Sequence, residues 1–205
     1  MKKLLKIDPL IKVKSSESLY KEPVVIYVSE ISDETSQNFS EEISEAHNTG
    51  QPVIPVIINS EGGDAYHLMS MISDMDHSML PIATIVPGVA MSAACVLLTC
   101  GTEGYRYASP NATIMIHDVS SWHGGKTEEI KADAKETVRL NKLIFNRMAR
   151  HCGQEPDFFI KSLHERGHAD WYLTPRQAQK LNLINHIRLP SMDINITLDI
   201  GFDRQ

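Results

Sequence analysis

Short apolar runs rich in β-branched residues alternate along the chain with longer segments in which apolar residues recur every three or four positions. The apolar runs are the segments 24–28, 53–58, 82–86 and 113–116. Runs of this length and composition predict buried strands. The segments with helical spacing are 33–47, 65–75, 92–100 and 126–151. Strands that alternate with helices in this order predict an α/β fold with a mostly parallel sheet.

The length and charge of the chain bound both its organisation and its partners. A chain of 205 residues can bury one sizeable core, but it leaves no room for a built-in ATPase module. The formal net charge of −6 disfavours a protein that binds nucleic-acid backbones. We therefore expect one folded domain and no nucleic-acid partner. We also expect a flexible polar arm at 1–22 before this domain and a separate tail at 191–205 after it.

The cysteines and the N-terminal segment indicate a cytoplasmic protein. The three cysteines lack the spacing of a disulfide framework or a zinc site, which indicates reduced thiols; they are Cys95, Cys100 and Cys152. The N-terminal apolar stretch is too interrupted for a signal peptide, because it contains Lys6, Asp8, Pro9 and Lys12. No run approaches the ~18 apolar residues of a membrane span. The sequence therefore predicts neither a membrane segment nor a bound metal.

Three turns stand out because each follows a predicted strand, where α/β folds place ligand-binding groups. The first holds Gly62 and Gly63, whose backbone N–H groups can face a reacting atom without an intervening side chain. The second leads to Ser92 at the start of an apolar helix, where the positive end of the helix dipole favours an alkoxide. The third ends in His117, and a histidine at the carboxyl end of a strand can act as a general base.

Each of these turns also has a purely structural interpretation. The glycines can form a tight strand-to-helix turn, Ser92 can cap the helix, and His117 can be a hydrogen-bonded structural histidine. Serine hydrolysis also needs a carboxylate that orients the base. Asp118 is a poor candidate for that role, because neighbouring residues on an extended chain point to opposite sides. A serine–lysine dyad is less favoured, since no lysine lies between Lys21 and Lys126.

In their order and separations, these motifs resemble those of the proteolytic subunit of Clp protease. The matching segments are Ile57–Gly63, Gly88–Ala94, Ile114–His117 and Asp170–Ala178. The resemblance covers roughly residues 23–190, which would form a Clp-type serine peptidase domain. It implies a crotonase-like Clp subunit fold, a βαβ superhelix with a protruding handle helix at about 126–151.

The resemblance also implies a role for each matching residue. Ser92 would be the nucleophile, His117 the base and Asp170 the carboxylate that orients His117. Backbone N–H groups of Gly63 and Ala93 would form the oxyanion hole. The protein would be an ATP-independent serine endopeptidase that cleaves short or unfolded polypeptides without a cofactor or metal.

The family resemblance extends to partners. It implies a homo-oligomer, either a heptameric ring or a stacked double ring, that encloses the active sites in a chamber. A separate AAA+ unfoldase would consume ATP and feed folded substrates into that chamber. The small size of the chain agrees with this division of labour, because it has no unfolding machinery of its own.

Two departures from the family pattern bear on substrate and assembly. Asp118 and Val119 stand where the family has glutamine and proline, so we expect these two residues, together with Gly62, to contact substrate and change its preference. His168 and Ala169 stand where the family has an acidic residue and an arginine that pair between rings. We therefore expect a double ring that is altered or sensitive to pH.

Three other interpretations remain open from the sequence. Segment 164–168 reads H-E-R-G-H, and on a helix two histidines at this spacing can bind zinc with the glutamate as general base of a metallopeptidase. Against this, no glutamate follows Glu165 to supply a third ligand, and the nearest downstream histidine is His186. An acyl-CoA enzyme of the same fold needs no Ser-His-Asp set. A non-catalytic ring subunit would be expected to lack one of the three triad residues.

Overall fold

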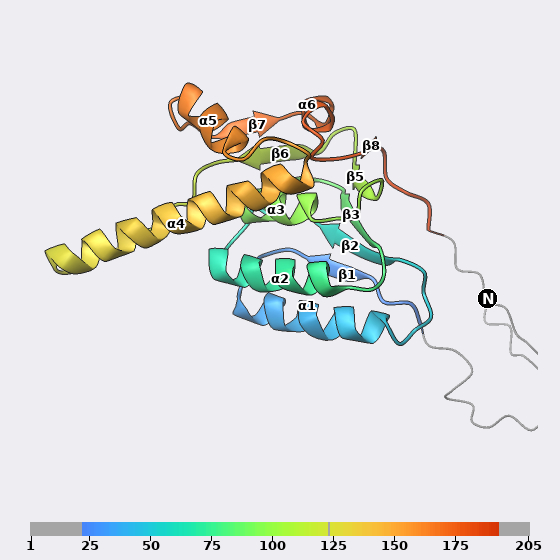
Figure 1. Cartoon of the computed structure of the whole chain (residues 1–205). Coiled ribbons are helices and arrows are strands. Elements are labelled where there is room, and N and C mark those ends of the chain that lie inside the picture. Colours follow the sequence, from blue (N-terminus) through green and yellow to red (C-terminus); the bar gives the residue numbers. More distant parts are fainter. Residues whose placement is uncertain (1–21, 123, 193–205) are drawn as a thin grey trace, which may run out of the picture.

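Five parallel strands form the centre of the structure, a computed structural model that describes residues 22–122 and 124–192. Their order across the sheet is β1-β2-β3-β5-β8, and every neighbouring pair is parallel. The strands are β1 (Ile26–Val28), β2 (Ile54–Ile58), β3 (Ile82–Val86), β5 (Arg106–Ala108) and β8 (His186–Ile187). The predicted α/β class and mostly parallel sheet are confirmed (Figure 1).

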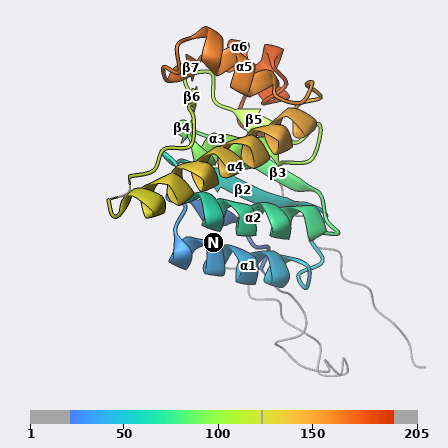
Figure 2. The ribbon, with the colours of Figure 1, turned by 60° about the vertical axis from the view of Figure 1, so that its left-hand side comes forward.

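Helices α1 (Asp33–Ala46) and α2 (Ala65–His77) pack side by side along the sheet (Figures 1 and 2). The apolar residues of α1 are buried as their helical spacing predicts, and they are Phe39, Ile43 and Ala46. The helix is capped by Ser32, whose hydroxyl accepts a backbone N–H of the first turn. Asp33 is the first residue of the helix, where the helix dipole favours its negative charge.

A second, smaller sheet carries segments that the sequence analysis singled out. It consists of β4 (Val89–Met91), β6 (Thr113–Ile116) and β7 (Trp171–Leu173), in that order. Strands β4 and β6 are parallel, whereas β7 is antiparallel to β6. Strands β4, β5, β7 and β8 were not predicted from the sequence, because they have only two or three residues and lie outside the long apolar runs.

Strand β5 was not predicted for a further reason, because it begins with a completely buried arginine, and a charged residue does not indicate a buried strand. Arg106 is 0% exposed, and its guanidinium pairs with Glu103 and donates to the backbone carbonyl of His151 at 3.1 Å. Its Nε also donates to the side chain of Asn185 at 3.2 Å. A buried charge is tolerated only with such partners, and two of these partners come from residues 45 and 79 positions away in the chain.

Helix α4 (Thr127–His151) projects from the body at its N-terminal end (Figures 1 and 2). The apolar residues of its second half are buried as predicted, and they include Leu140, Ile144 and Met148. The first half of the helix is not covered in the same way, because Ile130 and Val138 are 44% and 69% exposed. Helical spacing marks the shared face of these residues, but it does not reveal where the neighbouring elements stop.

Three shorter helices complete the described part of the chain, namely α3 (Ala93–Thr99), α5 (Phe158–Glu165) and α6 (Pro175–Lys180). Thr174 forms a capping box with Gln177 at the start of α6, and proline occupies the first helical position. Among the described residues, no helix is long and apolar enough to span a membrane. The predicted arm at 1–22 and tail at 191–205 lie outside the described residues, apart from residues 22, 191 and 192.

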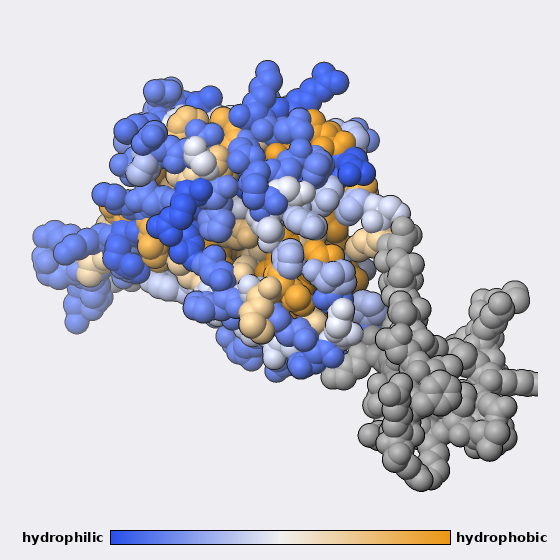
Figure 3. Space-filling model, turned by 45° about the vertical axis from the view of Figure 1, so that its right-hand side comes forward, coloured by the Kyte–Doolittle hydropathy of each residue, from blue (hydrophilic) through white to orange (hydrophobic). Residues whose placement is uncertain are grey.

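The surface carries several exposed apolar side chains among the polar ones. Figure 3 shows a mostly hydrophilic face with a patch of hydrophobic residues near its centre. Large apolar or aromatic side chains that are more than half exposed are Tyr27, Tyr66, Met79, Trp122, Val138, Tyr172 and Met192. By contrast, the three cysteines are buried and unpaired, in agreement with the predicted reduced thiols.

Candidate active site

Ser92 occupies a strained turn between strand β4 and helix α3. Its backbone has φ 54° and ψ −126°, and its side chain makes no capping hydrogen bond. Ser92 therefore occupies the N-cap position of α3, but its side chain does not cap the helix. The hydroxyl instead lies 2.7 Å from Nε2 of His117. A serine in a strained strand-to-helix turn presents its oxygen away from the main chain, as a nucleophile must.

His117 follows directly after strand β6, and the antiparallel partner strand brings a carboxylate beside it. Ile116 pairs with Trp171 in the β6–β7 register, so the next residue on β6 and the preceding residue on β7 lie opposite each other. Those residues are His117 and Asp170, and Nδ1 of the imidazole is 3.7 Å from Oδ1 of the carboxylate. This distance exceeds a hydrogen bond, but catalytic hydrogen bonds often tighten only when substrate binds.

The two glycines of the first turn lie against the nucleophile. Both have positive φ, +117° at Gly62 and +147° at Gly63. A Cβ at Gly62 would come within 2.8 Å of the Cβ of Ser92. In the described part of the chain, no turn, loop or cap hydrogen bond uses the backbone N–H of Gly63 or Ala93 as donor. Two free amides close to a serine hydroxyl can bind an oxyanion.

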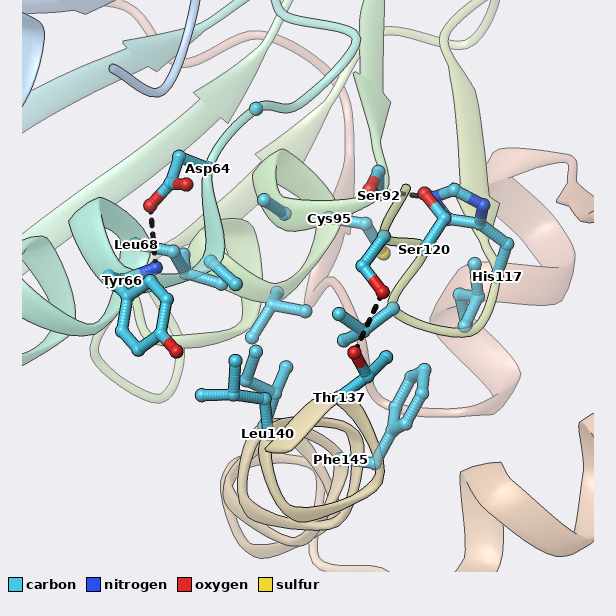
Figure 4. A pocket seen from close by; sticks show the side chains of 18 of the residues that line it. Asp64, Tyr66, Leu68, Ser92, Cys95, His117, Ser120, Thr137, Leu140 and Phe145 are labelled. Carbon is cyan, nitrogen blue, oxygen red and sulfur yellow. Dashed lines mark hydrogen bonds between the residues drawn. The ribbon is translucent and has the colours of Figure 1, made fainter. Parts of the chain in front are cut away.

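A cavity of about 360 Å³ opens beside Ser92 and His117. Figure 4 shows these two side chains at its edge, with Leu68 of α2 and Leu140 and Phe145 of α4 around it. The main apolar side chains that line the cavity are Leu68, Val96, Leu140, Ile144, Phe145 and Met148. Sequence patterns marked most of these residues only as core, because a cavity wall and a packed core have the same periodicity.

Asp118 and Val119 separate at the loop after β6. Val119 lines the cavity next to Ser92, and its backbone N–H donates to Oδ1 of Asn141 at 2.9 Å. Val119 also borders a second cleft between α4 and α5, whereas Asp118 lines only this second cleft. Its carboxylate accepts hydrogen bonds from His168 at 2.5 Å and Asn141 at 2.8 Å. The structure therefore places Val119 and Gly62 near the nucleophile and Asp118 outside that cavity.

The environment of Asp118 changes its acidity. Partial burial raises the pKa of this carboxyl, but hydrogen bonds from His168 and Asn141 outweigh it. The nearby imidazoles of His168 and His164 act in the same direction as these bonds. As a result, the pKa of Asp118 lies below its usual value, and the carboxylate is ionised at neutral pH.

The H-E-R-G-H segment does not form the continuous helix that the zinc interpretation needs. Helix α5 ends at Glu165, and Gly167 and His168 both have left-handed φ, at +66° and +58°. His164 and His168 nevertheless stay close, with ring centroids 4.2 Å apart. Within the described residues, no cluster of three or more potential ligands has the arrangement of a metal site.

Comparisons with known proteins all point to the same protein family. A family model described as Clp protease matches residues 10–190 of the chain. The chain is 31% identical over 134 residues to the ATP-dependent Clp protease proteolytic subunit of Deinococcus radiodurans, which covers 65% of this chain and 64% of the relative. It is 35% identical over 136 residues to the ATP-dependent Clp protease proteolytic subunit 3 of Nocardia farcinica. This alignment covers 65% of this chain and 60% of the relative. The match thus spans less than two thirds of each relative.

Proposed function

The chain belongs to the Clp protease family, and on that premise we propose that it is a serine endopeptidase subunit that cleaves short or unfolded polypeptides. The observation that carries this proposal is the 2.7 Å contact between the Ser92 hydroxyl and Nε2 of His117. We place the peptidase domain at residues 23–190, with α4 as its handle helix.

The proposed reaction starts with proton transfer between these two residues. His117 accepts the proton of the Ser92 hydroxyl at Nε2 while the oxygen attacks the carbonyl carbon of the scissile peptide bond. The same imidazole then donates this proton to the leaving amine, and an ester to Ser92 forms. Water hydrolyses the ester with His117 again as base. Asp170, on the Nδ1 side of the ring, holds the imidazole in the required tautomer.

The backbone around Ser92 supplies the remaining elements of the proposed site. The N–H groups of Gly63 and Ala93 stabilise the negative oxygen of the tetrahedral intermediate, and removal of one such donor typically costs about 10²–10³-fold in rate. The apolar cavity next to Ser92 accepts the side chain before the scissile bond. We therefore propose cleavage after residues with apolar side chains, because burial of such side chains is favourable there.

We extend the proposal to assembly and partners. The chain forms a homo-oligomeric heptameric ring or stacked double ring in the cytoplasm, and an AAA+ unfoldase delivers folded substrates to it. Exposed apolar side chains such as Val138 on α4 and Trp122 in the loop after β6 support contact with other protein chains. The words "ATP-dependent" in the names of both relatives support an ATP-driven partner.

Substitution of the nucleophile tests this proposal. We expect Ser92→Ala to abolish hydrolysis of a short fluorogenic peptide without a change in the oligomer detected by native mass spectrometry. His117→Ala should cost about as much, since triad members act as a unit. Phosphonate reagents should inactivate the wild type, whereas o-phenanthroline should not. An unchanged rate in the Ser92→Ala variant would refute the mechanism.

A further inference from the structure

A side-chain hydrogen bond joins the loop after β6 to the turn before β7. Nδ1 of His168 lies 2.5 Å from the carboxylate of Asp118. Asp118 directly follows His117, and His168 lies two residues before Asp170. The contact thus spans the two segments that carry the imidazole and the carboxylate of the proposed triad. Figures 1 and 2 show these segments meeting beside α5.

Helix α4 fixes the same loop from the other side. The side-chain amide of Asn141 donates to Asp118 at 2.8 Å, and its oxygen accepts the backbone N–H of Val119 at 2.9 Å. Asn141 therefore holds the loop after β6 in place, and His168 connects the turn before β7 to that loop. His168 itself has a φ of +58°, a conformation that His, Asn and Asp tolerate better than most residues.

We propose that His168 is a positioning residue for the proposed triad, because its hydrogen bond to Asp118 sets the distance between His117 and Asp170. This inference rests on the proposed function. The gap of 3.7 Å between the imidazole and the carboxylate makes the triad sensitive to small movements of either segment. A misplacement of about 1 Å can lower a catalytic rate by roughly 10²-fold.

The hydrogen bond from His168 ends on a charged group. The Asp118 carboxylate is ionised at neutral pH, and a hydrogen bond to an ionised acceptor is roughly twice as strong as one between neutral groups. The other titratable groups around this contact are His164, Glu165, Lys161 and Asp157 from α5 and its start, and Lys142 from α4.

The test compares two substitutions of His168. We expect His168→Ala to lower kcat for a fluorogenic peptide roughly tenfold with little change in KM, because the triad is misplaced while the cavity is intact. In His168→Asn, the amide N–H occupies the place of Nδ1–H and the left-handed φ is tolerated. This variant should restore kcat to near the wild-type value at pH 8. His77→Ala is the matched control, since His77 lies on α2 with an exposed side chain, and it should leave kcat unchanged.

Rescue by asparagine separates positioning from a general structural role. A hydrogen bond that holds the two segments together can also be made by an amide, so kcat of His168→Asn should lie well above that of His168→Ala while the two variants have similar KM. Equal losses of kcat in the two variants would overturn the proposal. So would wild-type kcat in His168→Ala with an intact oligomer.

A double-mutant cycle provides a second readout if His168→Ala impairs folding or assembly. His168→Asn and Asp118→Asn keep hydrogen-bonding groups of similar size, and the double variant should lose no more kcat at pH 6 than the worse single variant. Losses that multiply would overturn the proposal. The Ser92→Ala result distinguishes the positioning role of His168 from the proposed peptidase mechanism. An inactive Ser92→Ala together with a fully active His168→Ala refutes only the positioning role.

Discussion

Replacement of Gly62 by alanine is expected to disable the active site while the protein remains folded. Gly62 has φ +117°, and a Cβ there would lie 2.8 Å from the Cβ of Ser92 and 3.2 Å from the backbone nitrogen of Ala93. Carbon atoms in good contact are about 3.5–4.0 Å apart, so Ser92 must move by roughly 0.7–1.2 Å. A shift of about 1 Å predicts a loss of kcat of roughly 10²-fold.

The same substitution at a second glycine separates strain from crowding. Gly104 also has a left-handed conformation, with φ +87°, but a Cβ there would meet nothing within 4 Å. An unfavourable backbone conformation costs about 1–3 kcal/mol. Both variants should therefore lower the free energy of unfolding, Gly62→Ala by the larger amount because of its added contacts, and only Gly62→Ala should lower kcat.

Three measurements check this expectation. Urea unfolding gives the loss of stability, peptide hydrolysis gives kcat, and the rate of labelling by a fluorophosphonate reports the reactivity of Ser92. We expect slow labelling in Gly62→Ala and wild-type labelling in Gly104→Ala. The reasoning would be refuted by a Gly62→Ala variant with kcat within about threefold of the wild type, since a 1 Å shift costs far more, or by an equal loss in Gly104→Ala.

Two further predictions concern ionisation. Because the pKa of Asp118 is lowered in the folded protein, its contribution to stability is present above the unfolded value and is lost as the pH falls through the folded value. Asp118→Asn should thus be less stable than the wild type at pH 7, and urea unfolding should show this difference shrinking below about pH 4. Burial raises the pKa of the Cys100 and Cys152 thiols to about 12 and that of Cys95 still further. Native protein at pH 8 should therefore resist iodoacetamide, because the thiolate is the reactive form. Mass spectrometry should detect modification of all three cysteines only after unfolding.

Features that depend on local pattern could be predicted from the sequence. The longer strands β2 and β3 and helices α1, α2 and α4 follow from apolar periodicity, which needs only neighbouring residues. The turn positions of Ser92 and His117 also follow, because each comes directly after an apolar run. Asp170 could not be paired with His117 by such reasoning, since strand β7 has only three residues and its register with β6 depends on tertiary packing.

Other features depend on contacts that no local pattern encodes. The exposure of Ile130 and Val138 is one case, because the helix continues beyond the elements that cover it. The contact between Asp118 and His168 is another, since its two residues lie 50 positions apart. Neither residue stands in an apolar run, and the H-E-x-x-H pattern directed attention to zinc rather than to a bond with a distant carboxylate.

The antiparallel pairing of β6 with β7 has a consequence for protein synthesis. The chain delivers Ser92 and His117 well before residues 171–173, and Asp170 reaches His117 only when those residues add to the edge of β6. A nascent chain that still lacks them therefore has a serine and a histidine but no complete triad. On the proposed mechanism, this order of assembly delays peptidase activity until translation of the domain is almost finished, and neighbouring nascent polypeptides are spared premature cleavage.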